Sequence, residues 1–315
     1  MMQAKSETTD ASAAGEQADD WMSIPERGGV FGIYFFAVLA TMFGRTIPRL
    51  FLWVVVGYYY VFAAGARRAS REYHERLLGE VPSRWECYQH LLRFGQVALD
   101  RLFFARGQLE RFDFERHGHE HLEELRREEG GALLMGAHLG SFAAMKGAAS
   151  GEDLPVNALT YNANSKIING VIQKLDPEAR LRVIDLGEDR IQGILTVRDR
   201  LEDGEFVALL SDRVGVNDKF VEVDFLGETA QMPIGGFLLA SMLKCPVYLV
   251  FGLYRGRNDY ELHCEPFRDK VELPRGDERE DALREVTQAY ADRLEAYCHK
   301  APDNWFNFYD YWGSD

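Results

Sequence analysis

The spacing of hydrophobic positions changes near Gly130. Before this point the chain carries two long apolar runs and then segments with helical periodicity. After it, short apolar runs alternate with helical segments, a pattern typical of an α/β fold with a mainly parallel central sheet flanked by helices. Strands are expected at 132–135, 156–161, 182–186, 206–210 and 247–251, and helices at 138–149, 165–175, 190–202 and 235–243.

The two apolar runs, 30–43 and 50–66, predict an N-terminal helical hairpin. At 1.5 Å per residue they cover about 21 Å and about 25 Å, which is short of a hydrocarbon core of about 30 Å. We expect the pair to dip into one leaflet, with Arg45 and Arg49 at its turn and further arginines at 67, 68 and 71 facing anionic headgroups. Packing on the protein's own core and a transmembrane helix over 50–66 remain alternatives.

Composition and charge narrow the class of protein. Hydrophobic residues make up 46% and charged residues 27%, which are ordinary values for a folded body. A formal net charge of −14 disfavours nucleic-acid binding through phosphate contacts. Residues 1–21 lack apolar periodicity and read as a disordered acidic tail, followed by the hairpin at 22–76 and a catalytic domain at 77–315.

No metal site is predicted. The four cysteines are far apart and form no zinc or disulfide pattern. His117, His119 and His121 alternate within a charged stretch, and a metal site formed by these three side chains is the alternative interpretation. Residues two apart on a helix point in different directions, so a solvated face is the favoured interpretation.

The stretch 131–143 presents a histidine after a buried strand. A strand that ends in a small-residue turn places His138 at the carboxyl edge of the sheet, where open α/β sheets bind ligands. Asp212 and Arg213 follow another buried strand and are expected at the same edge. His138 is therefore the candidate general base, although a single histidine is more often structural than catalytic.

Four blocks of sequence resemble the bacterial lipid A biosynthesis acyltransferase family, the late-acyltransferase branch of the glycerolipid acyltransferase superfamily. They are His-Leu-Gly-Ser-Phe at 138–142, Ser-Asp-Arg at 211–213, Asp-Phe-Leu-Gly at 224–227, and the aromatic run at 305–312. Within the family the chain looks closest to members associated with aryl polyene pathways. The resemblance covers nearly everything after the tail.

The family's pattern is a histidine followed five residues later by Asp or Glu. The resemblance implies that His138 takes a proton from the acceptor while the carboxylate orients the imidazole. Here the fifth position is Ala143, so the chain is expected to be a poor catalyst. Three explanations compete: an inactivating substitution made in the laboratory, natural loss of the acid, or an acid supplied by Asp212. The first is favoured because the rest of the pattern is intact.

Two consecutive helical positions differ by 100°, so five residues on one helix would set the side chains at 138 and 143 roughly 140° apart. His138 must therefore lie on the loop before the helix, and Gly140 permits that turn. The aromatic run at 305–312 has no clean period, and it reads either as the wall of an acyl-chain groove or as packing for the final helix. The residues expected to contact substrate are Gly140, Ser141, Phe142, Arg213, Phe225 and Gly227, and Asp212 is counted with the catalytic group.

The resemblance implies transfer of an acyl group from acyl carrier protein or acyl-CoA to a lipid acceptor, at the cytoplasmic face of the inner membrane, with no cofactor. A thioesterase or hydrolase on the same fold is one rival, which the lack of a Gly-x-Ser-x-Gly elbow disfavours. The other rival is an inactive homologue that binds lipid or carrier protein through an emptied site.

Overall fold

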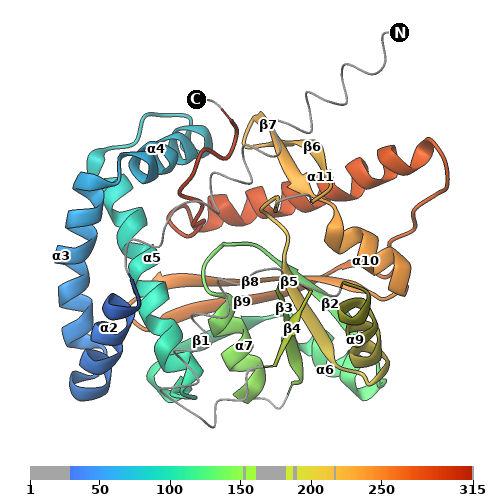
Figure 1. Ribbon diagram of the computed structural model, residues 1–315, viewed down its shortest axis with the longest axis horizontal. Coiled ribbons are helices and arrows are strands. Elements are labelled where there is room, and N and C mark those ends of the chain that lie inside the picture. The colour runs from blue at the N-terminus through green and yellow to red at the C-terminus, as the bar shows by residue number, and fades with distance from the viewer. Residues whose placement is uncertain (1–28, 152–153, 161–181, 187–189, 216–217, 314–315) are drawn as a thin grey trace. The chain divides into compact units, whose positions relative to one another are not determined.

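The computed structural model describes residues 29–151, 154–160, 182–186, 190–215 and 218–313 (Figure 1). The chain divides into two compact units. The first unit consists of Met1–Leu92, Ser211–Gly235 and Arg275–Asp315, and the second unit of Arg93–Leu210 and Gly236–Pro274. The tail expected at 1–21 and the helix expected at 165–175 lie outside the described residues.

The second unit contains a seven-stranded sheet in the order β1-β9-β8-β2-β5-β3-β4. Neighbouring strands are parallel except for the antiparallel pair β8 and β9. The mainly parallel α/β fold predicted from the sequence is therefore confirmed. The strands are β1 (Asp113–His117), β2 (Ala132–Gly136), β3 (Val156–Thr160), β4 (Val183–Asp185), β5 (Phe206–Leu210), β8 (Val247–Gly256) and β9 (Asp259–Arg268).

Helices of the second unit contact this sheet. Contacts join α6 (His119–Arg127) to β9, α7 (Phe142–Gly151) to β8, and α9 (Arg190–Glu202) to β5. A shared core of apolar side chains joins α6 and α7 to the sheet, because burial of apolar surface drives folding. The short 3-10 helix η1 (Leu109–Arg111) and α10 (Gly235–Leu243) complete the described elements here.

Two strands of the sheet were not predicted. β1 lies in the stretch that was interpreted as a charged, solvated segment, and within it only Phe114 is more than slightly shielded from solvent. It is held as the outermost strand by its parallel pairing with β9. β9 follows β8 through a tight reversal, and β8 continues to Gly256 where the expected strand ended at residue 251.

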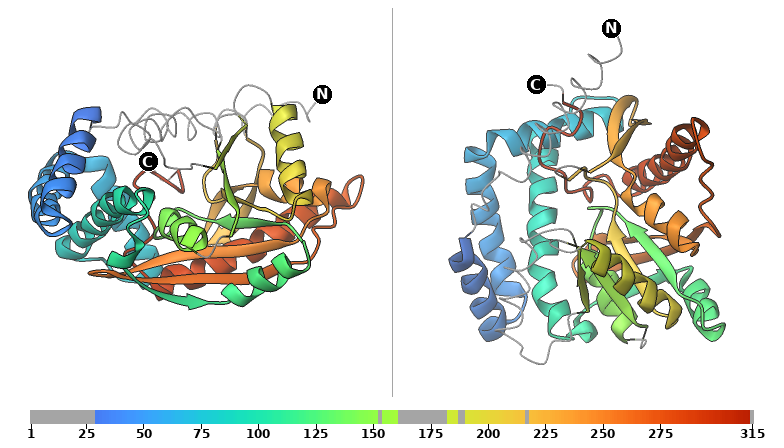
Figure 2. Two further views of the ribbon diagram at one scale, coloured as in Figure 1. Left: turned by 90° about the horizontal axis from the view of Figure 1, so that it is seen from below. Right: turned by 45° about the vertical axis from the view of Figure 1, so that its right-hand side comes forward.

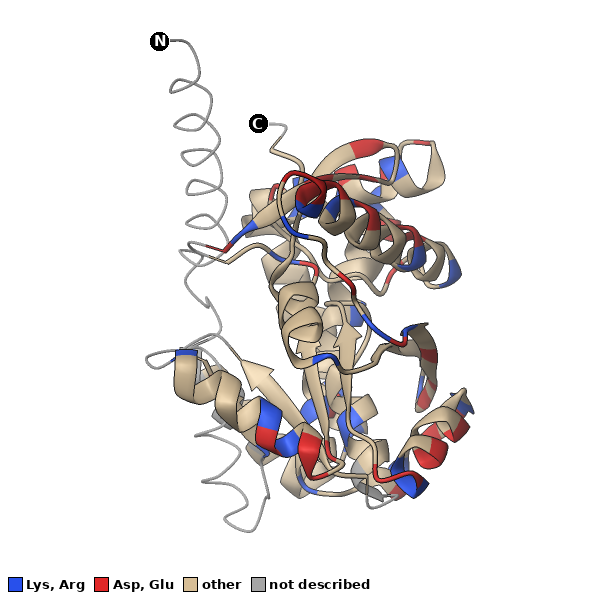
Figure 3. Ribbon diagram, turned by 90° about the vertical axis from the view of Figure 1, so that its right-hand side faces the viewer, with Lys and Arg blue, Asp and Glu red and all other residues tan. Residues whose placement is uncertain are grey.

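The first unit contains α2 (Gly29–Phe43), α3 (Thr46–Phe62), α4 (Ala64–Leu78) and the start of α5 (Arg84–Ala105). It also contains the antiparallel strands β6 (Phe220–Phe225) and β7 (Glu228–Pro233), and the long helix α11 (Glu278–Lys300), which contacts β6. Helices α2 and α3 contact each other and lie side by side in both views of Figure 2. Acidic and basic residues are interspersed along α11 (Figure 3), so this helix carries no patch of one sign.

The second apolar run does not form one continuous helix. Residues 50–66 are shared between α3 and α4, which meet at Ala63 with a bend of 93°. Arg67 donates to the carbonyl oxygens of Tyr60 and Val61, so its charge lies at the carboxyl end of α3, where the helix dipole favours a cation. Among the described helices, none alone has the length and hydropathy of a membrane span, and α3 and α4 satisfy that test only as a bent pair.

Candidate active site

His138 follows the central strand of the sheet by two residues. Strand β2 ends at Gly136, lies between β8 and β5, and runs parallel to both, so His138 follows the carboxyl ends of β2 and β5, while β8 continues to Gly256. Helix α7 begins only at Phe142, so His138 lies in the connecting loop, as the spacing argument requires. The side chain is partly exposed, which leaves an imidazole accessible at the edge where α/β sheets bind ligands.

The loop that carries His138 is fixed to β8 by two glycines. Gly140 has φ +67° and forms a bridge with Gly252, and the amide of Ser141 donates to the Gly252 carbonyl oxygen at 2.7 Å. A Cβ at Gly140 would lie 2.0 Å from that oxygen, and a Cβ at Gly252 would lie 2.5 Å from the backbone carbonyl oxygen of Ser141. Only glycine fits at either position, and the close approach holds the loop in one conformation.

Ser141 caps helix α7. Its Oγ accepts a hydrogen bond from the amide of Ala144 at 3.0 Å, the usual contact of an N-cap serine with the third residue of a helix. Ala143 is therefore in the first turn, and it is partly exposed. The positive end of a helix dipole favours a carboxylate in that turn. A Glu at position 143 would suit the fold, and the alanine leaves the site without that charge.

Asp212 belongs to the first unit and is completely buried there. Its Oδ2 accepts hydrogen bonds from Trp305 Nε1 at 3.1 Å and from Asn307 Nδ2 at 3.0 Å. Arg213 in turn donates through Nε to Asn307 Oδ1 and through Nη2 to the Phe306 carbonyl oxygen at 2.8 Å. The Asn307 amide thus joins the acid to the arginine.

The aromatic run at 305–312 closes over this pair. Trp305 is completely buried, and its ring contacts those of Tyr73, Phe225 and Tyr311 at centroid distances of 5.1, 5.3 and 4.7 Å. The Tyr311 hydroxyl donates to the Asp212 carbonyl oxygen at 2.9 Å. For Trp305 and Tyr311, packing is therefore the better description than a groove wall. Sequence reasoning noted the aromatic rings but missed Asn307, whose role depends on contacts across more than ninety residues.

Phe225 and Gly227 lie at a hairpin turn between β6 and β7. Leu226 and Gly227 both have positive φ, +55° and +76°, which is the conformation of the tight two-residue turns that join antiparallel strands. The Leu226 amide donates to Glu295 Oε2 at 2.7 Å, and the Phe225 side chain is completely buried. Phe225 and Gly227, expected from the sequence as substrate contacts, are thus parts of a hairpin.

Two buried histidines, His74 and His90, lie against each other, and His90 contacts Trp305. His90 lies 2.8 Å through Nε2 from the Trp305 carbonyl oxygen, which can only accept, so this nitrogen carries the proton and Nδ1 accepts from Ser70 Oγ at 3.0 Å. His74 Nδ1 donates to the Ser70 carbonyl oxygen at 2.8 Å. Burial holds the pKa of His90 well below its ordinary 6.5 and also lowers the pKa of His74. Both rings are therefore neutral at pH 7.

The predicted site residues thus form two groups. The second unit carries His138 with its neighbours Gly140, Ser141, Phe142 and Ala143, and the first unit carries Asp212, Arg213, Phe225 and Gly227. The loop of the second unit has the features of an acid–base centre: a partly exposed imidazole, a rigid backbone and a helix N-terminus. The group in the first unit has its acid and arginine engaged with the C-terminal segment.

A glycine-anchored histidine loop at the carboxyl edge of a mainly parallel sheet provides groups that acid–base chemistry on a bound ligand requires. Comparison with known families indicates a reaction class for the chain: residues 102–314 match the family model of the bacterial lipid A biosynthesis acyltransferases. The match covers more than half of the chain, which therefore belongs to that family. A search of curated proteins finds no match. Family membership supports acyltransferase activity, with an acyl donor and a lipid acceptor.

Proposed function

We propose that the protein transfers a fatty acyl group from a thioester, carried by acyl carrier protein or coenzyme A, to a hydroxyl or amine of a membrane amphiphile. His138 is the general base. The observation that carries this proposal is the position of His138 at the end of the central strand, in a loop fixed by Gly140 ahead of α7. Family membership supports the reaction class.

In the proposed reaction the His138 imidazole removes the proton from the acceptor as its oxygen or nitrogen attacks the thioester carbonyl carbon. The bond from carbon to the acceptor forms, the carbon–sulfur bond breaks, and the imidazolium returns the proton to the departing thiolate. Gly140, Ser141 and Phe142 adjoin the base in the chain and are proposed to contact the substrate. Arg213 and Gly227 are proposed substrate contacts as well, whereas the completely buried side chains of Phe225 and Asp212 support the packing around them.

Ala143 favours a second candidate function, that of an inactive homologue that binds lipid or carrier protein. The two functions are separated by Ala143→Glu, with the uncharged Ala143→Gln of nearly equal size as matched control. An orienting carboxylate contributes up to about 10⁴-fold to turnover. We expect Ala143→Glu to raise acyl transfer from acyl thioesters by about 10²- to 10⁴-fold, and Ala143→Gln to leave it near the starting level. If neither variant transfers an acyl group to any amphiphile, the binding function replaces the catalytic one.

The proposed membrane contact is the outer surface of α2 and α3. Helix α3 buries a stripe at every fourth position, Pro48, Leu52 and Val56, and most of its other side chains are apolar or aromatic. An apolar surface of this extent that is exposed to solvent marks an interaction site. Arg45 is buried, at 8% exposed, and is not part of this contact. The exposed residues are Phe35, Val38, Met42, Phe43, Leu50, Phe51, Trp53, Val54, Tyr58, Val61 and Phe62. We propose attachment to the cytoplasmic face of the inner membrane.

This contact is tested with the double variant Val54→Glu/Val61→Glu, since these side chains are 72% and 63% exposed and the change disturbs no core. The matched control is Ile191→Glu on α9, where a side chain 74% exposed lies outside the proposed surface. Sedimentation with phosphatidylglycerol-containing vesicles should fall for the double variant and not for the control. Equal sedimentation of both proteins would remove the proposed contact.

The proposed acceptor is an amphiphile other than lipid A itself, which the resemblance to members of aryl polyene pathways favours. Mass spectrometry of lipids that copurify with the protein tests this, because a slow transferase retains what it does not turn over. Recovery of lipid A precursors alone would overturn the assignment to this branch.

A further inference from the structure

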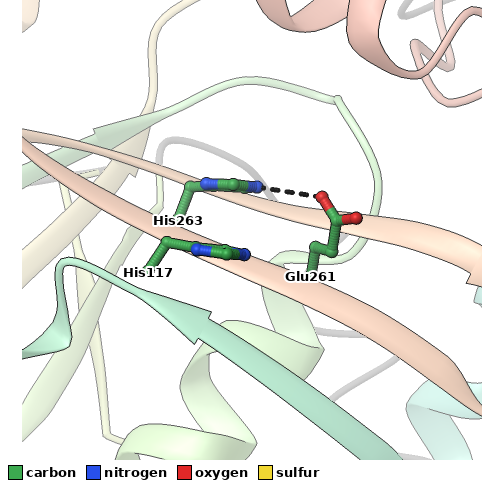
Figure 4. A group of neighbouring side chains, drawn as sticks. All are labelled: His117, Glu261 and His263. Atoms are coloured by element: carbon green, nitrogen blue, oxygen red, sulfur yellow. Dashed lines mark hydrogen bonds and ion pairs between the residues drawn. The ribbon is translucent and has the colours of Figure 1, made fainter.

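We propose that strands β1 and β9 hold a divalent transition-metal ion between His117, His263 and Glu261 (Figure 4). Each of these residues offers one ligand atom, and the three atoms lie within 4.8 Å of one another. The ligands lie on β1 and β9, whereas His138 lies in the loop after β2, and the metal site is given no part in the proposed acyl transfer. All three ligands belong to the second unit.

The pairing of the strands explains why these side chains meet. β1 and β9 are parallel, with His117 opposite His263 and Glu115 opposite Glu261. Side chains at alternate positions of a strand share one face, so the sequence Glu-x-His, present once in each strand, places four ligand groups on the same face. His119 and His121, which completed the alternate histidines of the sequence, lie on α6 and are outside this group.

The side chains are already oriented toward one another. The two imidazole rings are stacked, with centroids 4.6 Å apart and an interplanar angle of 7°. His263 Nε2 lies 3.2 Å from Glu261 Oε2, and His117 Nε2 lies 3.3 Å from Glu115 Oε1. In Figure 4 both rings point their outer nitrogens toward the end of the site at which Glu261 lies. Each histidine thus faces a carboxylate, and imidazole with carboxylate is a ligand set that zinc uses.

The site has one anchored and one adjustable ligand. The His263 side chain is 8% exposed and held inside the sheet, whereas the His117 side chain is 43% exposed on the outermost strand. Ligand bonds to zinc are about 2.0–2.2 Å long, so ligand atoms around a bound ion lie about 3–3.5 Å apart. Rotation of the exposed His117 ring supplies the small closure that this requires.

The neighbouring groups define the class of ion. Cys264 follows His263 but packs in the apolar core on the opposite face of the strand, so its sulfur is not among the ligand atoms. Two imidazoles and a carboxylate suit zinc, nickel or cobalt, whereas magnesium and calcium prefer oxygen ligands alone. The expected ion is therefore of the zinc class.

Arg255 competes with the ion for Glu261. Its Nε donates to Glu261 Oε1 at 2.8 Å and its Nη2 donates to Oε2 at 2.9 Å. A bidentate arginine holds both carboxylate oxygens, and its charge repels a cation. Removal of this side chain should therefore tighten metal binding, an effect that a merely structural cluster would not show.

The test is titration calorimetry of the full chain, purified without a histidine tag and freed of metal by chelation, with ZnCl₂ and with MgCl₂ as probes. Variants are His117→Ala, His263→Ala and Arg255→Ala. The matched control is His119→Ala, because the His119 side chain is 45% exposed and also lies beside a carboxylate, at 3.4 Å from Glu120. Circular dichroism checks that each variant folds, and His117→Ala removes only a partly exposed side chain.

We expect one zinc ion per chain and no magnesium binding. His117→Ala and His263→Ala should each weaken the zinc affinity by about tenfold or more, since loss of even an outer contact of a metal ligand costs about 10- to 100-fold. His119→Ala should bind zinc like the unaltered chain, and Arg255→Ala should bind it more tightly. The proposal is overturned if zinc does not bind, or if His117→Ala and His263→Ala bind it as well as His119→Ala does.

Discussion

The carboxylate of Asp212 accepts a hydrogen bond from the side-chain amide of Asn307 at 3.0 Å, inside the first unit. The same amide accepts from Arg213 through its oxygen. A charge without access to water is stable only when its hydrogen-bonding capacity is satisfied, and Asp212 is completely buried. The C-terminal segment therefore holds Asp212 and Arg213 in place through Asn307. The sequence analysis expected both residues at the edge of the sheet that carries His138.

Replacing Asn307 should therefore destabilise the protein. Asn307→Ala removes a donor from a buried carboxylate and an acceptor from an arginine, each a hydrogen bond to a charged group. We expect the free energy of unfolding in urea to fall by about 2–4 kcal/mol. Asn258→Ala, at an exposed position, is the comparison and should change it little. Equal losses in the two variants would show that the Asp212 contact does not matter to stability.

A second buried acid, Asp100 on α5, is paired within the second unit. Its Oδ2 accepts from the Tyr260 hydroxyl at 2.8 Å, and both residues are buried. Tyr260→Phe should lower the free energy of unfolding by about 1–3 kcal/mol, because it removes a donor from a buried carboxylate. Tyr254→Phe is the matched control, since its hydroxyl donates to the neutral carbonyl oxygen of Arg257 at 3.2 Å. A loss at Tyr254 as large as at Tyr260 would contradict this account.

Glycine at 140 is required by a close backbone contact as well as by its positive φ. Gly140→Ala brings a Cβ to within 2.0 Å of a carbonyl oxygen, so the loop must move or the protein unfolds. Gly227→Ala is the control, because φ there is +76° but no atom lies within 4 Å of the added Cβ. Thermal denaturation should show a loss of about 1–2 kcal/mol for Gly227→Ala, the usual cost of the left-handed conformation, and a larger loss for Gly140→Ala. Similar losses would mean that the contact with Gly252 is not tight.

Stability should also depend on pH through His90. Its pKa in the folded protein is held well below the ordinary 6.5 by burial, whereas the unfolded chain keeps the ordinary value. Below pH 6.5 the unfolded chain therefore binds a proton that the folded protein does not, and stability falls as the pH drops. Between pH 7.5 and pH 5.5 one such histidine costs on the order of 1 kcal/mol.

Urea unfolding at these two pH values tests the assignment with His90→Gln, which keeps hydrogen-bonding groups but does not titrate. The variant should show a smaller decrease in stability between pH 7.5 and pH 5.5 than the unaltered chain. His74, whose pKa burial also lowers, retains part of the dependence. An unchanged decrease in the variant would assign the pH dependence to other groups.

The sequence predicted the elements whose burial leaves a clear pattern. The strands β2 and β5 are apolar runs of five residues that are buried almost throughout, so their location followed from composition alone. β1 is polar at four of its five positions, and its pairing with β9 comes from a partner more than 140 residues away. No local signal reveals such a strand. The break between α3 and α4 at Ala63 likewise left no mark in an unbroken apolar run.

The candidate site was predictable to a similar extent. His138 could be found because it follows a recognisable strand and a glycine-containing turn. The bridge between Gly140 and Gly252 and the contacts of Asn307 join positions about a hundred residues apart, and they depend on tertiary structure. Likewise, the sequence favoured a solvated face over a metal site for the alternate histidines at 117–121, whereas the strand register places His117 beside possible ligands on β9.

The general base is tested most directly by removing the His138 imidazole in the Ala143→Glu background and measuring acyl transfer from a thioester to an amphiphilic acceptor. The account predicts that His138→Ala lowers turnover by at least about 10²-fold, the usual contribution of a positioned base. His299→Ala, on α11, should leave turnover unchanged. Transfer that continues at the same rate without the imidazole of residue 138 would contradict the central claim.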